Sequence, residues 1–213
     1  MPSLLDREIR AVLSEVAKSS ELSLSLTRKC VDAFLGRVDP QSVLDEVDRG
    51  AQILSFTHND LRIKISEVLA RFQPMASDLR TLISLMEISY GLVRLGRYAR
   101  NIAQTLVLFR EMRDCDIQIV VEPAEITESM VKKALQAVES RDVGLAREVM
   151  RMDDRVDGAY ESYLTERVLP GLEGVPACAV AITLILRYLE RMADHAVQIA
   201  EEAMYMAGGT RES

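Results

Sequence analysis

Apolar residues recur every three or four positions through most of this chain, in long stretches without proline. In the first half such stretches cover roughly residues 4–35, 40–69 and 77–113. At that spacing the apolar side chains fall on one face of an α-helix, and this face must be covered by other helices. The pattern therefore predicts three long helices that pack against one another.

The second half begins with a segment of different character. Between residues 114 and 124 the chain is rich in β-branched side chains, and Pro123 closes the segment. Such residues favour extended structure, so we expect a non-helical connector there. Helices are then predicted from Thr127 to Ser140, from Asp142 to about Val168 and, after a loop with two prolines, through about Met206.

The two halves contain an internal repeat. Residues 94–103 align with residues 191–200 at a constant offset of 97, with four identities in ten positions. A duplicated unit of three helices explains the repeat, because each helix has one apolar face that two antiparallel neighbours can bury. We therefore expect an all-α fold of two tandem antiparallel three-helix bundles, at residues 1–116 and 117–213.

Composition and charge narrow the function. The 26 Lys and Arg residues are outnumbered by 33 Asp and Glu residues, which gives a net charge of −7. This balance argues against nucleic-acid binding, which requires clustered cations. The N-terminus is charged where a signal peptide would be apolar, and the three cysteines include no CxxC pair. We expect a cytoplasmic protein without a disulfide framework.

Two pairs of carboxylates provide the candidate chemistry: Asp153 with Asp157, and Glu190 with Asp194. Each pair is spaced by four residues and so lies on one helix face, where like charges cost a few tenths of a kcal/mol. A bound cation would relieve this repulsion, and oxygen ligands favour magnesium, manganese, calcium or iron. An alternative remains open, in which the acids form a solvated face paired with neighbouring arginines.

No catalytic motif accompanies these acids. The two histidines, His58 and His195, lack the Glu three residues earlier that is typical of di-iron bundles. No metalloprotease motif, glycine-rich phosphate loop or nucleophile elbow is present. His195 follows Asp194 and is either an outer neighbour of a metal or an ordinary interface histidine. The sequence therefore predicts a protein that is not an enzyme.

Three segments resemble motifs of the PhoU family of phosphate-uptake regulators. Residues 73–80 read QPMASDLR and are similar to the family's QPxASDLR segment. Residues 190–194 (ERMAD) resemble its ERIGD motif, and residues 153–157 (DDRVD) resemble its DxxVD stretch. The resemblance covers nearly the whole chain, with the motifs in the family's order.

The resemblance implies two tandem three-helix bundles with metal ions, iron or others, bound on bundle surfaces by E/DxxxD motifs. In the second bundle the implied ligands are Asp153, Asp157, Glu190 and Asp194. The corresponding positions of the first bundle are Ala51, Ser55, Val93 and Arg97. Since the first set contains no carboxylate, we expect one divalent or trivalent metal site at most, and a divergent family member.

The resemblance also implies a function in phosphate homeostasis. Proteins of this family are negative regulators that couple a phosphate ABC transporter and its ATPase to a membrane-bound sensor histidine kinase, and they often form homodimers. The resemblance therefore implies that this chain meets a membrane only through its partners. Two other hypotheses remain: a carboxylate-bridged metalloenzyme, and a structural adaptor for a different transporter or regulator.

Overall fold

The computed structural model describes residues 3–109, 118–170 and 176–208. These residues form helices and no strand. The helices, in chain order, are α1 (Leu4–Phe34), α2 (Pro40–Phe72), α3 (Ala76–Leu108), α4 (Gln118–Ser140), α5 (Val143–Tyr163) with a π-helical turn η2 (Leu164–Val168), and α6 (Ala177–Met206).

Polar residues cap the starts of several of these helices. The Ser3 hydroxyl accepts a hydrogen bond from the backbone of Asp6, and the Asp6 carboxylate accepts one from the backbone of Ser3, which makes a capping box. Asp39 caps α2 ahead of Pro40, and Asp142 caps α5. These caps satisfy backbone N–H groups that a helix leaves unpaired at its start.

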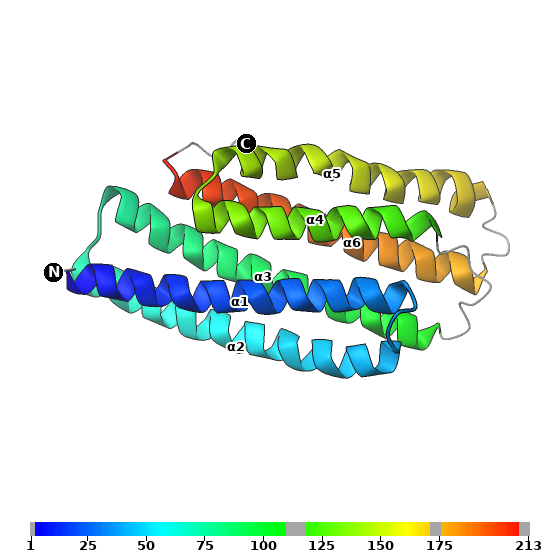
Figure 1. Ribbon diagram of the computed structural model, residues 1–213, viewed down its shortest axis with the longest axis horizontal. Coiled ribbons are helices and arrows are strands. Elements are labelled where there is room, and N and C mark those ends of the chain that lie inside the picture. The colour runs from blue at the N-terminus through cyan, green and yellow to red at the C-terminus, as the bar shows by residue number, and fades with distance from the viewer. Residues whose placement is uncertain (1–2, 110–117, 171–175, 209–213) are drawn as a thin grey trace.

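The six helices form two bundles that lie side by side with their long axes nearly aligned (Figure 1). The helices α1, α2 and α3 pack together, as do α4, α5 and α6, and the bundles join mainly through α3 and α6. At this junction Gly91 approaches α6 so closely that an added Cβ would lie 2.9 Å from Cγ1 of Ile199. Buried residues of all six helices form one continuous core. The predicted all-α fold of two three-helix bundles is confirmed.

The predicted connector at residues 114–124 is partly wrong. Residues 118–124 belong to α4, whereas residues 114–117 and the predicted boundary between 116 and 117 lie outside the described residues. Val120, Pro123 and Ala124 are buried against the core, and this burial outweighs the β-propensity of the segment. Pro123 lacks the N–H of one helical hydrogen bond, while its carbonyl accepts a hydrogen bond of 2.8 Å from the Thr127 hydroxyl.

Cys30 is a buried free thiol, whereas Cys178 is disulfide-bonded, which the sequence did not predict. Among the described helices, none has an apolar stretch of the length and purity that a bilayer crossing requires.

Candidate metal centre on α5 and α6

Three of the four predicted ligands come together where α5 packs against α6. Asp153 and Asp157 lie on α5 and Asp194 lies on α6, and each offers a carboxylate oxygen within 4.8 Å of the others. Within the described residues this is the one group of three potential ligands at such short separations. The arrangement joins two helices through their acidic side chains.

The positions of these acids follow from the apolar faces of their helices. Val156 on α5 is buried, and Asp153 and Asp157 border it three residues before and one residue after. On α6, Asp194 follows the buried Ala193. When two helices pack along their apolar faces, residues at the borders of those faces meet along the groove between them. The carboxylates therefore converge at the edge of the interface.

Burial and neighbouring carboxylates at this edge disfavour the ionised forms of Asp153 and Asp157. Burial, followed by the charge of Asp157 and then that of Asp194, raises the pKa of Asp153 to about 7. Burial and Asp194 also raise the pKa of Asp157, although Arg187 and Arg191 oppose that rise. The Oδ1 atom of Asp153 is buried and accepts no hydrogen bond from any described residue. The site thus has a deficit of positive charge and of hydrogen-bond donors.

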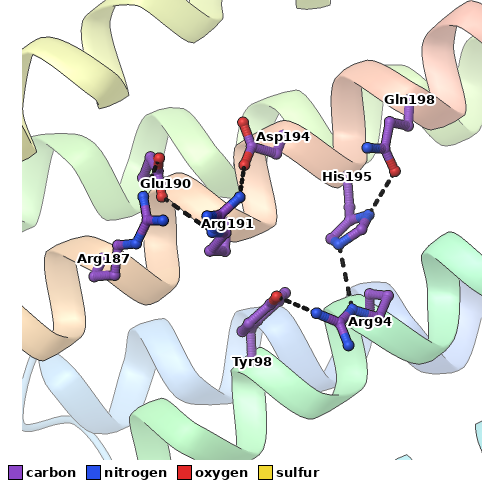
Figure 2. A network of polar contacts seen from close by, with 8 residues as sticks. All are labelled: Arg94, Tyr98, Arg187, Glu190, Arg191, Asp194, His195 and Gln198. Carbon is purple, nitrogen blue, oxygen red and sulfur yellow. Dashed lines mark hydrogen bonds and ion pairs between the residues drawn. The ribbon is translucent and has the colours of Figure 1, made fainter.

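Glu190, the fourth predicted ligand, lies beside this group and not in it. One of its oxygens pairs with Arg187, and the other lies 3.8 Å from Nε of Arg191 (Figure 2). Nη1 of Arg191 also donates to Oδ2 of Asp194 at 3.0 Å. Burial raises the pKa of Glu190, as does Asp194, while the two arginines lower it. Both candidate ligands on α6, Glu190 and Asp194, are therefore paired with arginine residues of the same helix.

The solvated-face alternative expected arginine partners for the acids of α5 as well. Among the described residues, neither Asp153 nor Asp157 forms an ion pair with an arginine. Arg155, which is two residues from both Asp153 and Asp157 and so lies on a different face of α5, pairs with Glu122 of α4. In the first bundle, Ala51 and Val93 are buried and Arg97 is exposed, so the counterpart of the site has no carboxylate. The two bundles therefore differ in chemistry at equivalent positions.

His195 lies at the junction of the bundles, where the sequence left its role open. Its Nδ1 hydrogen bonds to Oε1 of Gln198 at 2.7 Å, and its Nε2 accepts from Nε of Arg94 at 3.4 Å (Figure 2). Its ring also stacks on Tyr98 with the centroids 5.8 Å apart. Burial lowers its pKa, which fits a neutral imidazole that accepts from an arginine. The interface role is the one that the structure supports.

The contact between Tyr98 and His195 does not follow from helical periodicity, but the internal repeat contains a signal for it. The repeat offset of 97 aligns Tyr98 with His195, so the two rings occupy equivalent positions on α3 and α6. Because α3 and α6 lie side by side and run in opposite directions (Figure 1), equivalent positions on them meet near the middle of the junction, where Tyr98 and His195 lie. Repeat symmetry thus predicts contacts that helical periodicity alone does not.

Comparison with known proteins identifies the family. The profile of the family described as "PhoU domain" matches residues 16–106 and 120–203, one segment in each bundle. The chain belongs to the PhoU family. A PhoU homologue from Zymomonas mobilis is 28% identical over 204 residues, which cover 94% of this chain and 84% of the relative. One from Pseudomonas aeruginosa is 36% identical over 148 residues, which cover 67% of this chain and 61% of the relative. Both are described as phosphate-specific transport system accessory proteins.

Solved PhoU structures agree with the observed architecture. The crystal structure of PhoU from Pseudomonas aeruginosa matches with a TM-score of 0.88 at 29% identity, over 96% of this chain and 99% of that one. A PhoU from Streptococcus pneumoniae matches with a TM-score of 0.86 at 21% identity, over 98% and 99% of the two chains. The second likeness concerns the fold alone.

Proposed function

We propose that this chain is a cytoplasmic accessory protein of a phosphate transport system that negatively regulates phosphate uptake and phosphate-starvation signalling. Its relatives are described as accessory proteins of phosphate-specific transport. The partners that we propose are the ATPase of a phosphate ABC transporter and a sensor histidine kinase, with contact to the membrane only through them. The protein acts by binding and not by turnover.

A metal ion on α5 and α6 assists this docking. Asp153, Asp157 and Asp194 would hold it, because their oxygens are close together, and one oxygen of Asp153 is buried without a donor. Glu190 would join them if its pair with Arg187 opened. The ion, when bound, supplies the positive charge that the carboxylates lack, and iron, manganese and magnesium all accept such ligands. The convergence of three carboxylates is the observation that carries this proposal.

A bound ion would tie α5 to α6 and fix the face that these helices present. Without it, the carboxylates repel one another and resist close approach. We therefore expect the metal to affect partner binding through the geometry of the second bundle. The first bundle, which has no such acids, should keep its fold whether or not metal is present.

Elemental analysis of the purified protein tests the metal site. After exposure to iron, manganese or magnesium, the wild type should retain about one ion per chain, and the Asp153→Asn/Asp194→Asn variant should retain none. Asp154→Asn is the matched control, because Asp154 is an exposed acid of the same helix outside the group of three. Equal metal content in all three proteins would contradict the assignment of these residues.

Binding to partners tests the regulatory part separately. The purified ATPase of the phosphate transporter and the cytoplasmic part of the sensor kinase should each retain the wild-type protein in a pull-down. Loss of the metal should weaken this binding by about tenfold if the ion contributes about 1.4 kcal/mol. Binding that is absent for both partners would overturn the proposed regulation even if metal is bound.

A further inference from the structure

A groove of about 420 Å³ lies between α1 of the first bundle and α4 of the second. The two helices run side by side in opposite directions at the junction of the bundles (Figure 1). Arg28 of α1 pairs with Glu128 of α4 at 2.9 Å, and the groove begins one turn from this pair, at Leu24 and Lys132. None of its described lining residues belongs to the candidate metal centre, so the groove is a separate feature of the fold.

The inside of the groove is apolar. Its floor consists of Val16 of α1, Leu85 of α3 and Met206 of α6, all of which are buried. Its walls include Leu24 of α1 and Leu135 of α4, which are partly buried. Small-molecule sites in proteins are concave, mostly apolar and about 300–1,000 Å³ in volume, and they occur between the helices of bundles. The groove has these features, and side chains from four helices shape it.

Four exposed charged residues line the rim of the groove: Glu21, Lys132, Glu139 and Arg141. None of the four forms an ion pair or a side-chain hydrogen bond with another described residue, although other charges of α1 and α4 are paired. Exposed acids and lysines within helices are ordinary, because water solvates them and they favour helix. Arg141 differs from the other three, because it lies just outside a helix in an unusual backbone conformation.

The backbone of Arg141 is left-handed, with a φ of 55°, directly after the last residue of α4. The N–H of Asp142 donates to the carbonyl of Ala137 at 3.2 Å, which is the hydrogen bond of a Schellman turn. This conformation favours glycine, and glycine has a positive φ after α1 and α6, at Gly36 and Gly208. A cation suits the end of a helix, but a position within the last turn would provide it without a left-handed backbone. The turn itself therefore does not explain an arginine here.

We propose that the groove binds a small amphiphile with one apolar chain and a carboxylate head, such as a fatty acid. The chain occupies the apolar interior, and the head pairs with the guanidinium of Arg141 at the rim. A planar guanidinium can donate two parallel hydrogen bonds to one carboxylate. The volume admits a single alkyl chain and excludes the two chains of a phospholipid. Because α1 and α4 belong to different bundles, the bound ligand contacts both.

Arg141 is the reason for choosing an anionic head. Glu21 and Glu139 on the same rim would favour a cation, but both are exposed residues of regular helix, whose presence requires no ligand. Arg141 occupies a position that disfavours its backbone, and a ligand paired with its side chain offsets this cost. Glu139→Gln should therefore strengthen binding, whereas removal of the Arg141 side chain should weaken it. Opposite effects from two charges on one rim identify the charge of the head group.

Isothermal titration calorimetry of the full chain with decanoate tests the site. The wild type should bind one molecule per chain, and Arg141→Gly should weaken this binding by about tenfold or more, because a charge-assisted pair is lost. Decanol has the same chain without the charge, and its affinities for the two proteins should agree within about twofold. Arg141→Gly should also raise the thermal midpoint of the ligand-free protein, because glycine adopts a positive φ freely. Weaker binding together with a higher midpoint excludes damage to the fold as the cause.

Three results of this titration would contradict the proposal. A wild type that does not bind decanoate has no such site. Equal losses of decanoate and decanol affinity in Arg141→Gly would show that Arg141 does not contact the head. Tighter binding of decyltrimethylammonium than of decanoate would show that Glu21 and Glu139 select the head group, which would then be a cation.

A second pair of variants tests the location. Ala17 is an exposed small residue of α1 that lines the groove, so Ala17→Phe should fill part of it and abolish the binding of both decanoate and decanol. Ser25→Phe is the matched control, because Ser25 is an exposed small residue of the same helix outside the groove lining. Circular dichroism should show the same helical content for both variants. Decanoate binding that Ala17→Phe leaves unchanged would place the ligand elsewhere and overturn the assignment of the groove.

Discussion

Asp153 is the residue at which burial and like charges have the largest combined effect on the candidate centre. Its pKa rises from 3.8 to about 7 in the folded protein. Between those values the folded state binds more protons than the unfolded chain, so the free energy of unfolding falls as the pH rises. In metal-free protein Asp153→Asn should therefore raise the thermal midpoint increasingly from about pH 4 to above about pH 7.

The stabilisation by Asp153→Asn should be measurable at neutral pH. Allowing for the partial exposure of Asp153, we expect about 1 kcal/mol, or about 2–4 °C in the midpoint of a chain of this size. Thermal unfolding followed by circular dichroism in a chelating buffer gives the difference between variant and wild type at each pH. The exposed Asp154→Asn serves as the comparison and should show a weaker trend, because the charge of Asp154 is only a minor cause of the raised pKa of Asp153. A difference that is the same at all pH values would contradict the raised pKa.

The same proton should compete with the metal. A carboxylate must be deprotonated to bind a cation, so ion binding at Asp153 and Asp157 releases protons. We expect metal affinity to fall steadily as the pH drops below about 7, where a site of ordinary carboxylates would lose affinity only near pH 4. Titration calorimetry in buffers of different ionisation enthalpy measures the released protons. An affinity that is constant between about pH 5 and pH 8 would show that the aspartates do not hold the ion.

The sequence could predict the identity of these acids but not their environment. The spacing of Asp153 and Asp157, and of Glu190 and Asp194, was enough to place each pair on one helix face. The separation of Glu190 from the group depends on how Arg187 and Arg191 orient on α6, and the raised pKa of Asp153 depends on the packing of α5 against α6. Both are consequences of tertiary structure, which a pattern along the chain does not contain.

At the scale of elements, the approach of α3 to α6 depends on a residue without a side chain. A Cβ on Gly91 would lie 2.9 Å from Cγ1 of Ile199, whose side chain is buried. Gly91→Ala should force the helices apart and destabilise the protein by about 1–3 kcal/mol, less the smaller gain in helix propensity. Gly158→Ala on α5, where no atom lies within 4 Å of the added Cβ, should instead stabilise the chain by up to about 1 kcal/mol. Urea denaturation measures the free energy of unfolding of both variants. A Gly91→Ala variant that is more stable than the wild type would show that α6 can shift to accommodate the added methyl group.

Helices with strong periodicity were predictable, and the segment before Thr127 was not. The apolar repeats were enough to place α2 and α5 close to their observed bounds. For α4, local preference pointed to an extended connector, because β-branched residues precede Pro123. The burial of Val120 and Pro123 against the core decided in favour of helix. Where local propensity and tertiary burial disagree, the sequence alone favours the wrong element.

At the scale of the whole molecule, the two bundles share one hydrophobic core. Buried residues of α3 and α6 meet along the junction, and His195 of α6 contacts Arg94 and Tyr98 of α3. Separating the bundles would expose this apolar surface and leave the polar groups of the junction unpaired. The bundles should therefore unfold together in one transition, although only the second has the candidate metal site.

Metal binding should then stabilise the bundle that does not bind it. An ion at a hundredfold excess over its Kd stabilises the folded state by about 2.7 kcal/mol, and in a shared transition this applies to the whole chain. Hydrogen exchange should show slower exchange for core amides of α2, such as Leu54 and Ile65, as well as for those of α5 and α6. The Asp153→Asn/Asp194→Asn variant, at the same protein concentration, should show no such effect. Protection confined to the second bundle, with two separate thermal transitions, would show that the junction between α3 and α6 is too weak to couple the repeats.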